Sequence, residues 1–252
     1  MIEKQTIAIS EYFYSIQGEG PSSGLPAVFC RLKGCNLRCG GPTTLTTKKI
    51  ESPATWRCDT MEVWTKGTKF LIHDLISQWE KEGLLDRLRE GARLIITGGE
   101  PLLQQSAIVH LLSTLRKVLN KSIPIEIETN GTITPSIDLQ KINCWYNCSP
   151  KLHSSGTKKE DRLIPEAIQF FSKNPKSIFK WVVSSDADIE EIMTTFITPF
   201  KINTKTVYLM PASCSKKAYL SQLETVIPMA KKNGFNVSPR LHLQLWDQKT
   251  GI

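Results

Sequence analysis

Arg93-Leu-Ile-Ile-Thr-Gly-Gly-Glu-Pro101 is the stretch that decides the fold class, together with the segment 103–119 that follows it. Its first four residues form a short apolar run that is typical of a buried strand. In 103–119 apolar residues recur at helical spacing, which predicts a helix with one apolar face made of Ile108, Leu111, Leu112, Leu115, Val118 and Leu119. A buried strand, a Gly-rich turn and an amphipathic helix form one unit of a parallel α/β sheet.

The same alternation continues on both sides of this unit. Further strands are predicted at 9–16, 27–32, 124–129, 144–148, 178–183, 207–210 and 235–246. Further helices are predicted at 71–82, 164–172, 187–196 and 219–232. We therefore expect an α/β fold with parallel strands and crossover helices, arranged as a partial or complete barrel. Residues 40–57 are polar and show no periodicity, so they are expected to form an inserted loop.

Small and polar residues stand where the predicted strands end. They include Thr97-Gly-Gly-Glu100, Thr129-Asn-Gly131, Ser149-Pro-Lys151 and Pro211-Ala-Ser213. In parallel α/β proteins functional residues gather at the carboxyl ends of the strands. The sequence therefore predicts a site at this rim.

The composition is that of a globular protein, and we expect residues 1–252 to form a single domain. No run approaches the roughly 18 apolar residues of a membrane span, and the N-terminus lacks the features of a secretion signal. A cytoplasmic protein is therefore expected. The net charge of +8 comes from scattered basic pairs, so we favour a solvated basic surface over a nucleic-acid groove.

The cysteines indicate a metal or cluster site rather than a disulfide framework, because their number is odd and four of the seven lie within residues 30–58. Cys35 and Cys39 follow a predicted strand, and Cys58 can join them if residues 40–57 loop out. Three thiolates could hold a [4Fe–4S] cluster with one open iron. A zinc site with a fourth ligand and plain core packing are the alternatives. The other thiols are not expected to be ligands, and core packing suits the first three: Cys30, Cys144, Cys148 and Cys214.

Several segments, in order along the chain, resemble the 7-carboxy-7-deazaguanine synthase family of radical S-adenosylmethionine (radical SAM) enzymes. They are Ser15–Gly20, Val28–Arg31, Gly34–Cys39, Cys58–Thr60, Thr97–Pro101, Ile127–Gly131, Ser149–Lys151 and Arg240–His242. One feature departs from the superfamily, whose third cysteine usually lies three residues after the second and follows an aromatic residue. Here nineteen positions separate Cys39 from Cys58, and Arg57 precedes the last thiol.

The resemblance implies a partial (β/α) barrel of the radical SAM type and a particular reaction. A reduced [4Fe–4S] cluster passes one electron to S-adenosylmethionine, and the resulting radical starts the ring contraction of 6-carboxy-5,6,7,8-tetrahydropterin to 7-carboxy-7-deazaguanine with loss of ammonia. The product leads toward queuosine-type nucleosides. The resemblance further implies Mg²⁺, an electron donor such as flavodoxin or ferredoxin, a homodimer, and no direct nucleic-acid or membrane partner.

The same resemblance assigns residues to each ligand. The cluster would be held by Cys35, Cys39 and Cys58, and Mg²⁺ by Thr60. The substrate would contact Ile16, Gln17, Gly18, Glu19, Arg31, Thr97 and His242. S-adenosylmethionine would contact Gly99, Glu100, Ser149, Pro150 and Lys151, with Glu100 at the methionine amino group.

Ordinary structural roles are the alternatives for several of these residues. Arg31 could be a surface charge at a strand edge, Glu19 could be solvated in its turn, and Thr60 could cap the following segment. Thr129-Asn-Gly131 is interpreted as turn chemistry only. Lys180 could point either to the site or to solvent.

Two other functions share part of this pattern. A glycyl-radical-enzyme activase would have the cluster and the Gly-Gly-Glu segment, but it would not need the Gln17–Gly20 turn or the His242 segment. A non-catalytic, metal-stabilised nucleic-acid-binding module would fit the positive net charge. Iron content and absorption after anaerobic reconstitution separate a cluster enzyme from a zinc module.

Overall fold

The computed structural model describes residues 5–213, 215–247, 249 and 251, so Cys214 lies outside the described residues. The strands are β1 (Thr6–Ile16), β2 (Pro26–Leu32), β3 (Thr68–Leu71), β4 (Arg93–Gly98), β5 (Ile125–Thr129), β6 (Cys144–Cys148), β7 (Ser177–Val183), β8 (Val207–Pro211) and β9 (Asn236–Val237). The longer helices are α3 (Ile72–Lys81), α5 (Gln105–Leu119), α8 (Pro165–Lys173) and α11 (Lys216–Asn233). The shorter helices are α1 (Thr44–Thr47), α2 (Met61–Trp64), α4 (Leu84–Arg89), α6 (Ile137–Gln140), α7 (Lys159–Arg162), α9 (Asp186–Glu191), α10 (Thr198–Phe200) and α12 (Leu241–Trp246).

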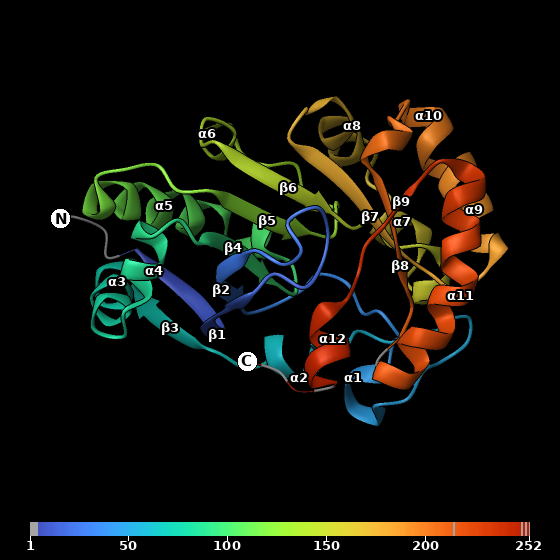
Figure 1. Ribbon diagram of the computed structural model, residues 1–252, viewed down its shortest axis with the longest axis horizontal. Helices are drawn as coiled ribbons and strands as arrows, with labels where there is room; N and C mark the ends of the chain where they lie inside the picture. Colours follow the sequence, from blue (N-terminus) through green and yellow to red (C-terminus); the bar gives the residue numbers. More distant parts are fainter. Residues whose placement is uncertain (1–4, 214, 248, 250, 252) are drawn as a thin grey trace.

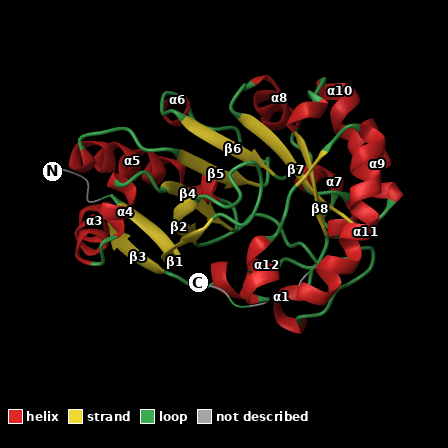
Figure 2. Cartoon of the chain, viewed as in Figure 1, coloured by secondary structure: helices red, strands yellow, loops and turns green. Residues whose placement is uncertain are grey.

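A nine-stranded sheet in the order β3-β1-β2-β4-β5-β6-β7-β8-β9 organises the fold (Figure 1). β1 pairs antiparallel with β2 and β3, whereas each neighbouring pair from β2 to β9 is parallel. The order begins at β3 and ends at β9, so the curved sheet is an open, partial barrel. Figure 2 shows the helices α5, α8, α9 and α11 along its outer side, with α12 across the open side. The predicted fold class is confirmed.

The core lies between the sheet and the outer helices. Leu94 and Ile96 of β4 are fully buried against α5, whose apolar face is buried as predicted except for Val118, which is 46% exposed. On the other half of the barrel Phe179 stacks on Trp181 with 5.3 Å between ring centroids. The prediction that three cysteines pack in the core is also confirmed, because all are buried: Cys30, Cys144 and Cys148.

The predicted strand at 235–246 is wrong beyond its first residues. β9 covers only Asn236–Val237, and the chain then forms helix α12. Leu241, Leu243 and Leu245 alternate along the sequence, but Leu243 is buried whereas Leu245 is 64% exposed, which is not the pattern of a strand with one buried face. Pro239 cannot donate to a ladder, and Arg240 accepts the first helical hydrogen bonds from Leu243 and Gln244. Strand β3 and the short helices α2, α4, α6, α7 and α10 were also not predicted.

The insertion, residues 40–57, leaves the barrel after Cys39 and returns beside it. It contains the short helix α1, which was not predicted. Gly40 donates to the Ser155 carbonyl at 2.8 Å and Thr55 donates to the Ser154 carbonyl at 2.9 Å, so both ends of the insertion dock on one loop. The Cys58 amide then donates to the Cys39 carbonyl at 3.2 Å. The long sequence gap between these cysteines is therefore closed in space.

Along each parallel strand alternate side chains point away from the helices and into the barrel. Near the carboxyl ends these inward positions hold Thr97 of β4, Glu128 of β5, Asn147 of β6 and Lys180 of β7, which all line one cavity. Within the described residues, no helix is long and apolar enough to cross a membrane.

Candidate active site

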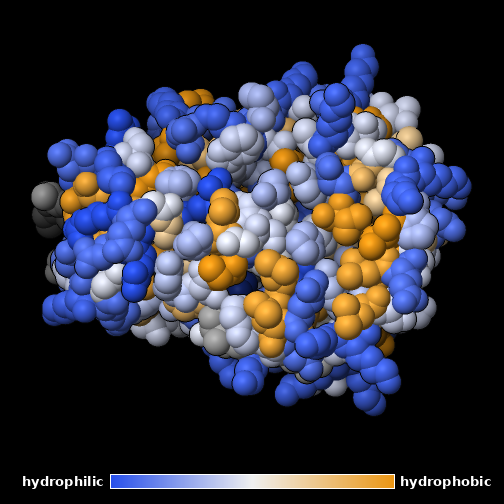
Figure 3. All heavy atoms as spheres, viewed as in Figure 1, coloured by the Kyte–Doolittle hydropathy of each residue, from blue (hydrophilic) through white to orange (hydrophobic). Residues whose placement is uncertain are grey.

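A cavity of about 870 Å³ opens at the carboxyl ends of the parallel strands. Figure 3 shows this face of the molecule, whose surface is hollowed near the centre. Every site residue predicted from the sequence lines this cavity except Glu100 and Pro150, which are buried behind its wall. The structure therefore brings together residues that are up to 226 positions apart, from Ile16 to His242.

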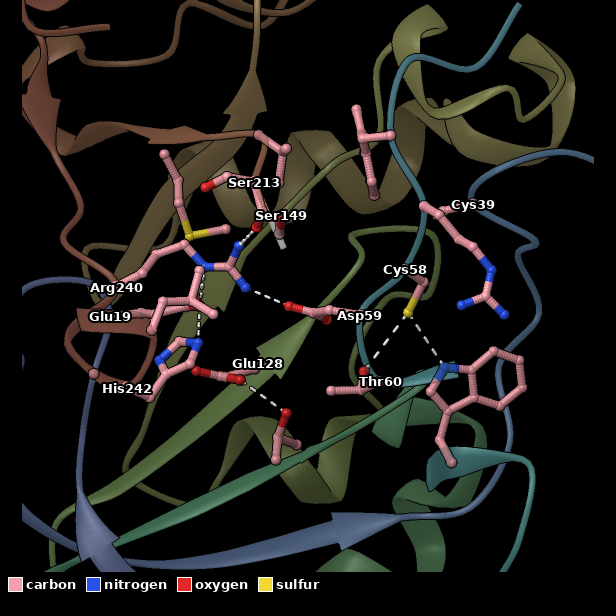
Figure 4. A pocket seen from close by; sticks show the side chains of 18 of the residues that line it. Glu19, Cys39, Cys58, Asp59, Thr60, Glu128, Ser149, Ser213, Arg240 and His242 are labelled. Carbon is pink, nitrogen blue, oxygen red and sulfur yellow. Dashed lines mark hydrogen bonds and ion pairs between the residues drawn. The ribbon is translucent and has the colours of Figure 1, made fainter. Parts of the chain in front are cut away.

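Three cysteines share one side of the cavity. Cys35 and Cys39 lie in the loop after β2, and Cys58 enters from the end of the insertion. Three N–H groups donate to these thiols. The Leu37 amide donates to Cys35 Sγ at 3.4 Å, the Asn130 side chain donates to the same sulfur at 4.0 Å, and Trp64 Nε1 donates to Cys58 Sγ at 3.5 Å. The Trp64 contact and the adjacent Thr60 hydroxyl are drawn in Figure 4.

These thiols fit a [4Fe–4S] cluster better than a single ion. Within the described part of the chain, no three His, Cys, Asp or Glu side chains are placed to share one metal ion. A structural zinc needs four such ligands around one centre. A cluster instead takes each thiolate on a different iron, so its ligands stand further apart. Burial raises the pKa of Cys39 to about 12 and also raises that of Cys35, so these two thiols ionise near neutral pH only when a bound cation stabilises the thiolates.

The Gly-Gly-Glu segment joins the end of β4 to the cysteine loop. A Cβ on Gly99 would lie 2.3 Å from the Gly34 carbonyl oxygen and 2.5 Å from Cys35 Cβ, so only glycine fits. The Glu100 amide donates to the same carbonyl at 2.9 Å. Gly99 was expected to contact S-adenosylmethionine, and the structure shows that its lack of a side chain makes room for the cysteine loop.

Glu100 is fully buried and its carboxylate is bound by protein donors. Oε1 accepts from the Leu102 amide at 2.9 Å, Oε2 accepts from the Asn130 amide at 2.6 Å, and the Thr129 hydroxyl lies within 3.0 Å of both oxygens. Burial raises the pKa of Glu100 to about 7 despite these donors. Thr129-Asn-Gly131 was interpreted as turn chemistry only, and it also holds this carboxylate.

The loop after β6 supplies the opposite wall of the cavity. Lys151 Nζ donates to the Ser149 carbonyl at 2.9 Å and to its hydroxyl at 3.0 Å, which orders a cation beside the cysteines. Pro150 packs behind this wall, where its ring is buried.

The loop between β1 and β2, residues 17–25, folds over the barrel interior, and we call it the substrate turn. Its first residue, Gln17, is 2% exposed and donates to Glu128 Oε1 at 3.3 Å. Gly18 lies against His242, because a Cβ there would come within 2.6 Å of Nδ1. The Leu241 amide donates to the Gly18 carbonyl at 3.0 Å, so α12 begins on the turn itself.

Glu19 is the centre of a buried charge network (Figure 4). Lys180 Nζ donates to Oε2 at 2.5 Å, and Arg240 Nε donates to Oε1 at 3.3 Å. Arg240 also binds Asp59 and the Ser213 carbonyl, and His242 Nε2 lies 3.8 Å from Glu19. Glu19 is therefore an ion-paired residue rather than a solvated one, and Lys180, which is 4% exposed, faces the site.

The charges of this network shift its pKa values. Burial acts to raise the pKa of Glu19, but the charges of Lys180 and Arg240 outweigh it, and the pKa lies well below its usual range. Burial lowers the pKa of His242, so the ring is neutral at pH 7. Against the effect of burial, Glu19 and Glu128 raise the pKa of Lys180, which therefore stays charged.

Arg31 and Thr60 also reach the cavity. Arg31 Nε donates to Glu11 Oε1 at 2.8 Å, and this ion pair fixes the plane of a guanidinium that is 14% exposed. The Thr60 hydroxyl lies 3.6 Å from Cys58 Sγ and makes no cap to helix α2. Thr60 does stand at the N-cap position of α2, where its carbonyl accepts from the Val63 and Trp64 amides, but its hydroxyl is not a capping group.

Several residues that line the cavity were not predicted to do so, although most of them lie in motifs that carry the family resemblance. Asp59, Glu128 and Arg240 each stand inside a segment of the family resemblance, but no role was assigned to them. Trp56 lines the cavity from the insertion, which carried no sequence signal. Asp59 and Arg240 are charged residues within two positions of assigned ones, and Glu128 is a charged residue near the end of a predicted strand; these were the available signals.

An open barrel whose strand ends carry three clustered thiols and a Gly-Gly-Glu segment defines a radical SAM enzyme. The family described as a 4Fe-4S single cluster domain matches residues 16–148. Solved structures with this fold include QueE from Escherichia coli, at 24% identity, a TM-score of 0.63 and coverage of 92% of this chain and 93% of that one. Native anSMEcpe with bound AdoMet matches at 16% identity with a TM-score of 0.53, covering 81% of this chain and 61% of that one.

Curated relatives specify the family within this class. The 7-carboxy-7-deazaguanine synthase of Pyrobaculum aerophilum is 30% identical over 97% of both chains. The enzyme of the same name from Thermoplasma acidophilum is 36% identical over 97% of this chain and 99% of its own. That from Clostridium acetobutylicum is 31% identical over 97% and 98%. The chain belongs to the 7-carboxy-7-deazaguanine synthase family, and neither alternative function is favoured.

Proposed function

We propose that this protein converts 6-carboxy-5,6,7,8-tetrahydropterin to 7-carboxy-7-deazaguanine, a precursor of queuosine-type nucleosides. The observation that carries the proposal is the single cavity, which places the substrate turn opposite three cysteines that fit a cluster. Full-length similarity to relatives named as this synthase supports it. Residues 1–252 are proposed to act as one domain, because every strand in the described part of the chain belongs to one sheet.

Each group of residues has a separate task in this reaction. Cys35, Cys39 and Cys58 would hold the [4Fe–4S] cluster, which with bound S-adenosylmethionine supplies a 5′-deoxyadenosyl radical. Ser149 and Lys151 would bind S-adenosylmethionine from the loop after β6. Gly99 and the buried Pro150 would shape that binding site. Glu100 has lone-pair capacity left for one further donor, which suits the methionine amino group.

The substrate turn would read the edge of the pterin ring through Ile16, Gln17, Gly18 and Glu19. The Gln17 side chain is already bonded within the protein, so we assign recognition chiefly to the backbone of the turn and to the Glu19 carboxylate. Thr97, whose hydroxyl donates to Glu128 at 2.8 Å, and the neutral His242 ring would close the site from two sides.

Arg31 would bind the substrate carboxylate. Glu11 holds Nε, so the planar guanidinium keeps its two Nη groups for a bidentate contact in a shielded wall of the cavity. Thr60 would complete a Mg²⁺ site together with substrate oxygens and water, because Mg²⁺ keeps few protein ligands. The reaction needs one electron at a time, and a flavodoxin or ferredoxin is the proposed donor. A homodimer is the oligomeric state expected for the family.

Product analysis tests this function. The purified chain is reconstituted anaerobically with iron and sulfide and incubated with 6-carboxy-5,6,7,8-tetrahydropterin, S-adenosylmethionine, a reductant and Mg²⁺. We expect about four irons per chain and formation of 7-carboxy-7-deazaguanine and ammonia. These two products together contain all the atoms of the pterin, so the hydrogen that the radical removes is returned and the conversion consumes no S-adenosylmethionine net. A fully loaded protein that cleaves S-adenosylmethionine without converting the pterin would contradict the proposal.

A further inference from the structure

A second contact of the substrate turn lies deeper in the barrel than the cavity. The turn is closed on itself by two backbone bonds between Gln17 and the stretch Gly24–Leu25, both 2.8 Å long. At its middle Ser22 is only 4% exposed, and its hydroxyl donates to Glu126 Oε2 at 2.8 Å. The Gly20 amide donates to Ser238 Oγ at 2.8 Å. The substrate turn is therefore held by hydrogen bonds to residues that do not line the cavity as well as by contacts at the cavity.

Two glutamates of β5 hold the turn at two depths. Glu126 and Glu128 are two residues apart on a strand, so both point into the barrel, about 7 Å from each other along the strand. Glu128 lines the cavity and receives Gln17, whereas Glu126 does not line it and receives Ser22.

Glu126 is a buried carboxylate that the proposed chemistry does not use. It is 2% exposed and accepts from three donors on three different segments: Ser22 of the turn, Arg93 of β4 and Asn147 of β6, the last at 3.0 Å. Arg93 supplies the balancing charge. Asn147 itself lines the cavity. One carboxylate thus connects the substrate turn, two barrel strands and the cavity wall.

We propose that Glu126 is a positioning residue for substrate binding, which holds the substrate turn through Ser22 so that residues 16–19 face the pterin. The inference rests on the proposed function for the identity of the ligand. A carboxylate at this position satisfies all three donors, whereas an amide cannot, because its NH₂ group would face either Arg93 or the two donors Ser22 and Asn147. Loss of either contact leaves the turn free to shift relative to Lys180 and Arg240.

The test uses the reconstituted full chain and two variants, Ser22→Ala and Glu126→Gln. Binding of 6-carboxy-5,6,7,8-tetrahydropterin is measured by anaerobic equilibrium dialysis without reductant, and KM and kcat are measured with reductant. We expect Ser22→Ala to weaken pterin binding about tenfold, since it removes a hydrogen bond to a charged group, and Glu126→Gln to weaken it at least as much. The double variant should bind no more weakly than Glu126→Gln alone, because both changes break one connection.

Two further measurements separate positioning from general structural damage. Iron content and S-adenosylmethionine cleavage without pterin should stay at the parent level in both variants. Asp188→Asn is the matched control: Asp188 is 4% exposed and accepts from Ser184 and Ser185 at the start of α9, outside the cavity. It should lower the thermal unfolding midpoint and leave pterin affinity unchanged.

The inference is overturned if Ser22→Ala and Glu126→Gln bind the pterin as tightly as Asp188→Asn does. It is also overturned if cluster content, cofactor cleavage and pterin affinity fall together. Failure of the proposed function looks different, because the parent protein would then bind the pterin without forming product, or would not bind it at all.

Discussion

Lys180→Met tests how much the buried ion pair between Lys180 and Glu19 contributes to the stability of the folded protein. Methionine keeps an unbranched side chain of similar length but removes the ammonium group. That group is 4% exposed, donates to Glu19 Oε2 at 2.5 Å and lies 4.0 Å from Glu128 Oε1. Removing one partner of a buried ion pair costs about 3–5 kcal/mol. Because Arg240 still pairs with Glu19, we expect about 3 kcal/mol.

For a chain of this length that loss corresponds to a fall of about 6–12 °C in the midpoint of thermal unfolding. The assay is circular dichroism of the anaerobic, reconstituted protein at pH 7. Lys180→Met/Glu19→Gln should recover most of the loss, because the carboxylate nearest to residue 180 is then neutral and Glu128 keeps its donors Gln17 and Thr97. The control is Lys141→Met, which breaks an ion pair with Asp138 whose partners are 69% and 71% exposed, and it should change stability by less than about 1 kcal/mol.

The pH dependence of stability independently tests whether an ionised Glu19 is what destabilises the Lys180→Met variant. Glu19 has a lowered pKa in the folded protein, so its stabilising contribution is present above the unfolded pKa and is lost as the pH falls through the folded pKa. Without Lys180 the pKa of Glu19 rises, and mild acid neutralises this carboxylate, which has lost its closer partner, in the variant. The gap between parent and variant should therefore be widest near pH 7 and should narrow toward pH 5. A loss below about 1 kcal/mol at pH 7, or a gap that does not change with pH, would refute the reasoning.

The remaining predictions concern the cavity. Arg31→Ala should raise the pterin KM by an amount equivalent to about 2–4 kcal/mol, and Arg31→Lys should recover part of it, while S-adenosylmethionine cleavage without pterin continues; equal loss of both would mean a structural role. Thr60→Val should lower product formation and blunt its response to added Mg²⁺, whereas Thr60→Ser should retain more activity; unchanged Mg²⁺ stimulation in the valine variant would exclude Thr60 as the ligand. Gly18→Ala would place a Cβ 2.6 Å from His242 Nδ1, so we expect a loss of about 1–3 kcal/mol in stability by thermal unfolding, and parent-like stability would contradict the close packing. Replacing a cluster ligand by alanine should abolish iron binding after reconstitution, and this is expected for Cys35, Cys39 and Cys58. Replacing a core cysteine by alanine should leave the iron content unchanged, and this is expected for Cys30, Cys144 and Cys148. The opposite pattern in the iron analysis would reject the assignment.

Local sequence determined the fold class because the signals that define it are short-range. The apolar run at 93–96 and the helical spacing in 105–119 can each be read within one turn or one strand, and they hold in the structure. The motifs Gly34–Cys39 and Thr97–Pro101 were visible for the same reason. The strand predicted at 235–246 was wrong because its local sequence does not show long-range contacts. Arg240 contacts Glu19 and Asp59, and these contacts hold the start of α12 over the cavity.

Tertiary structure alone decided which charges meet. Glu19, Lys180 and Arg240 are separated by 161 and 60 positions, and their pairing follows from the curvature of the sheet rather than from any spacing. The sequence left Lys180 equally open to solvent and site because alternation along a buried parallel strand does not mark which face is the barrel interior. The closure of residues 40–57 beside Cys39 depended likewise on hydrogen bonds to Ser154 and Ser155. The sequence gives the chemical type of each side chain. Which side chains meet depends on the strand order and on the curvature of the sheet, and these exist only in the folded barrel.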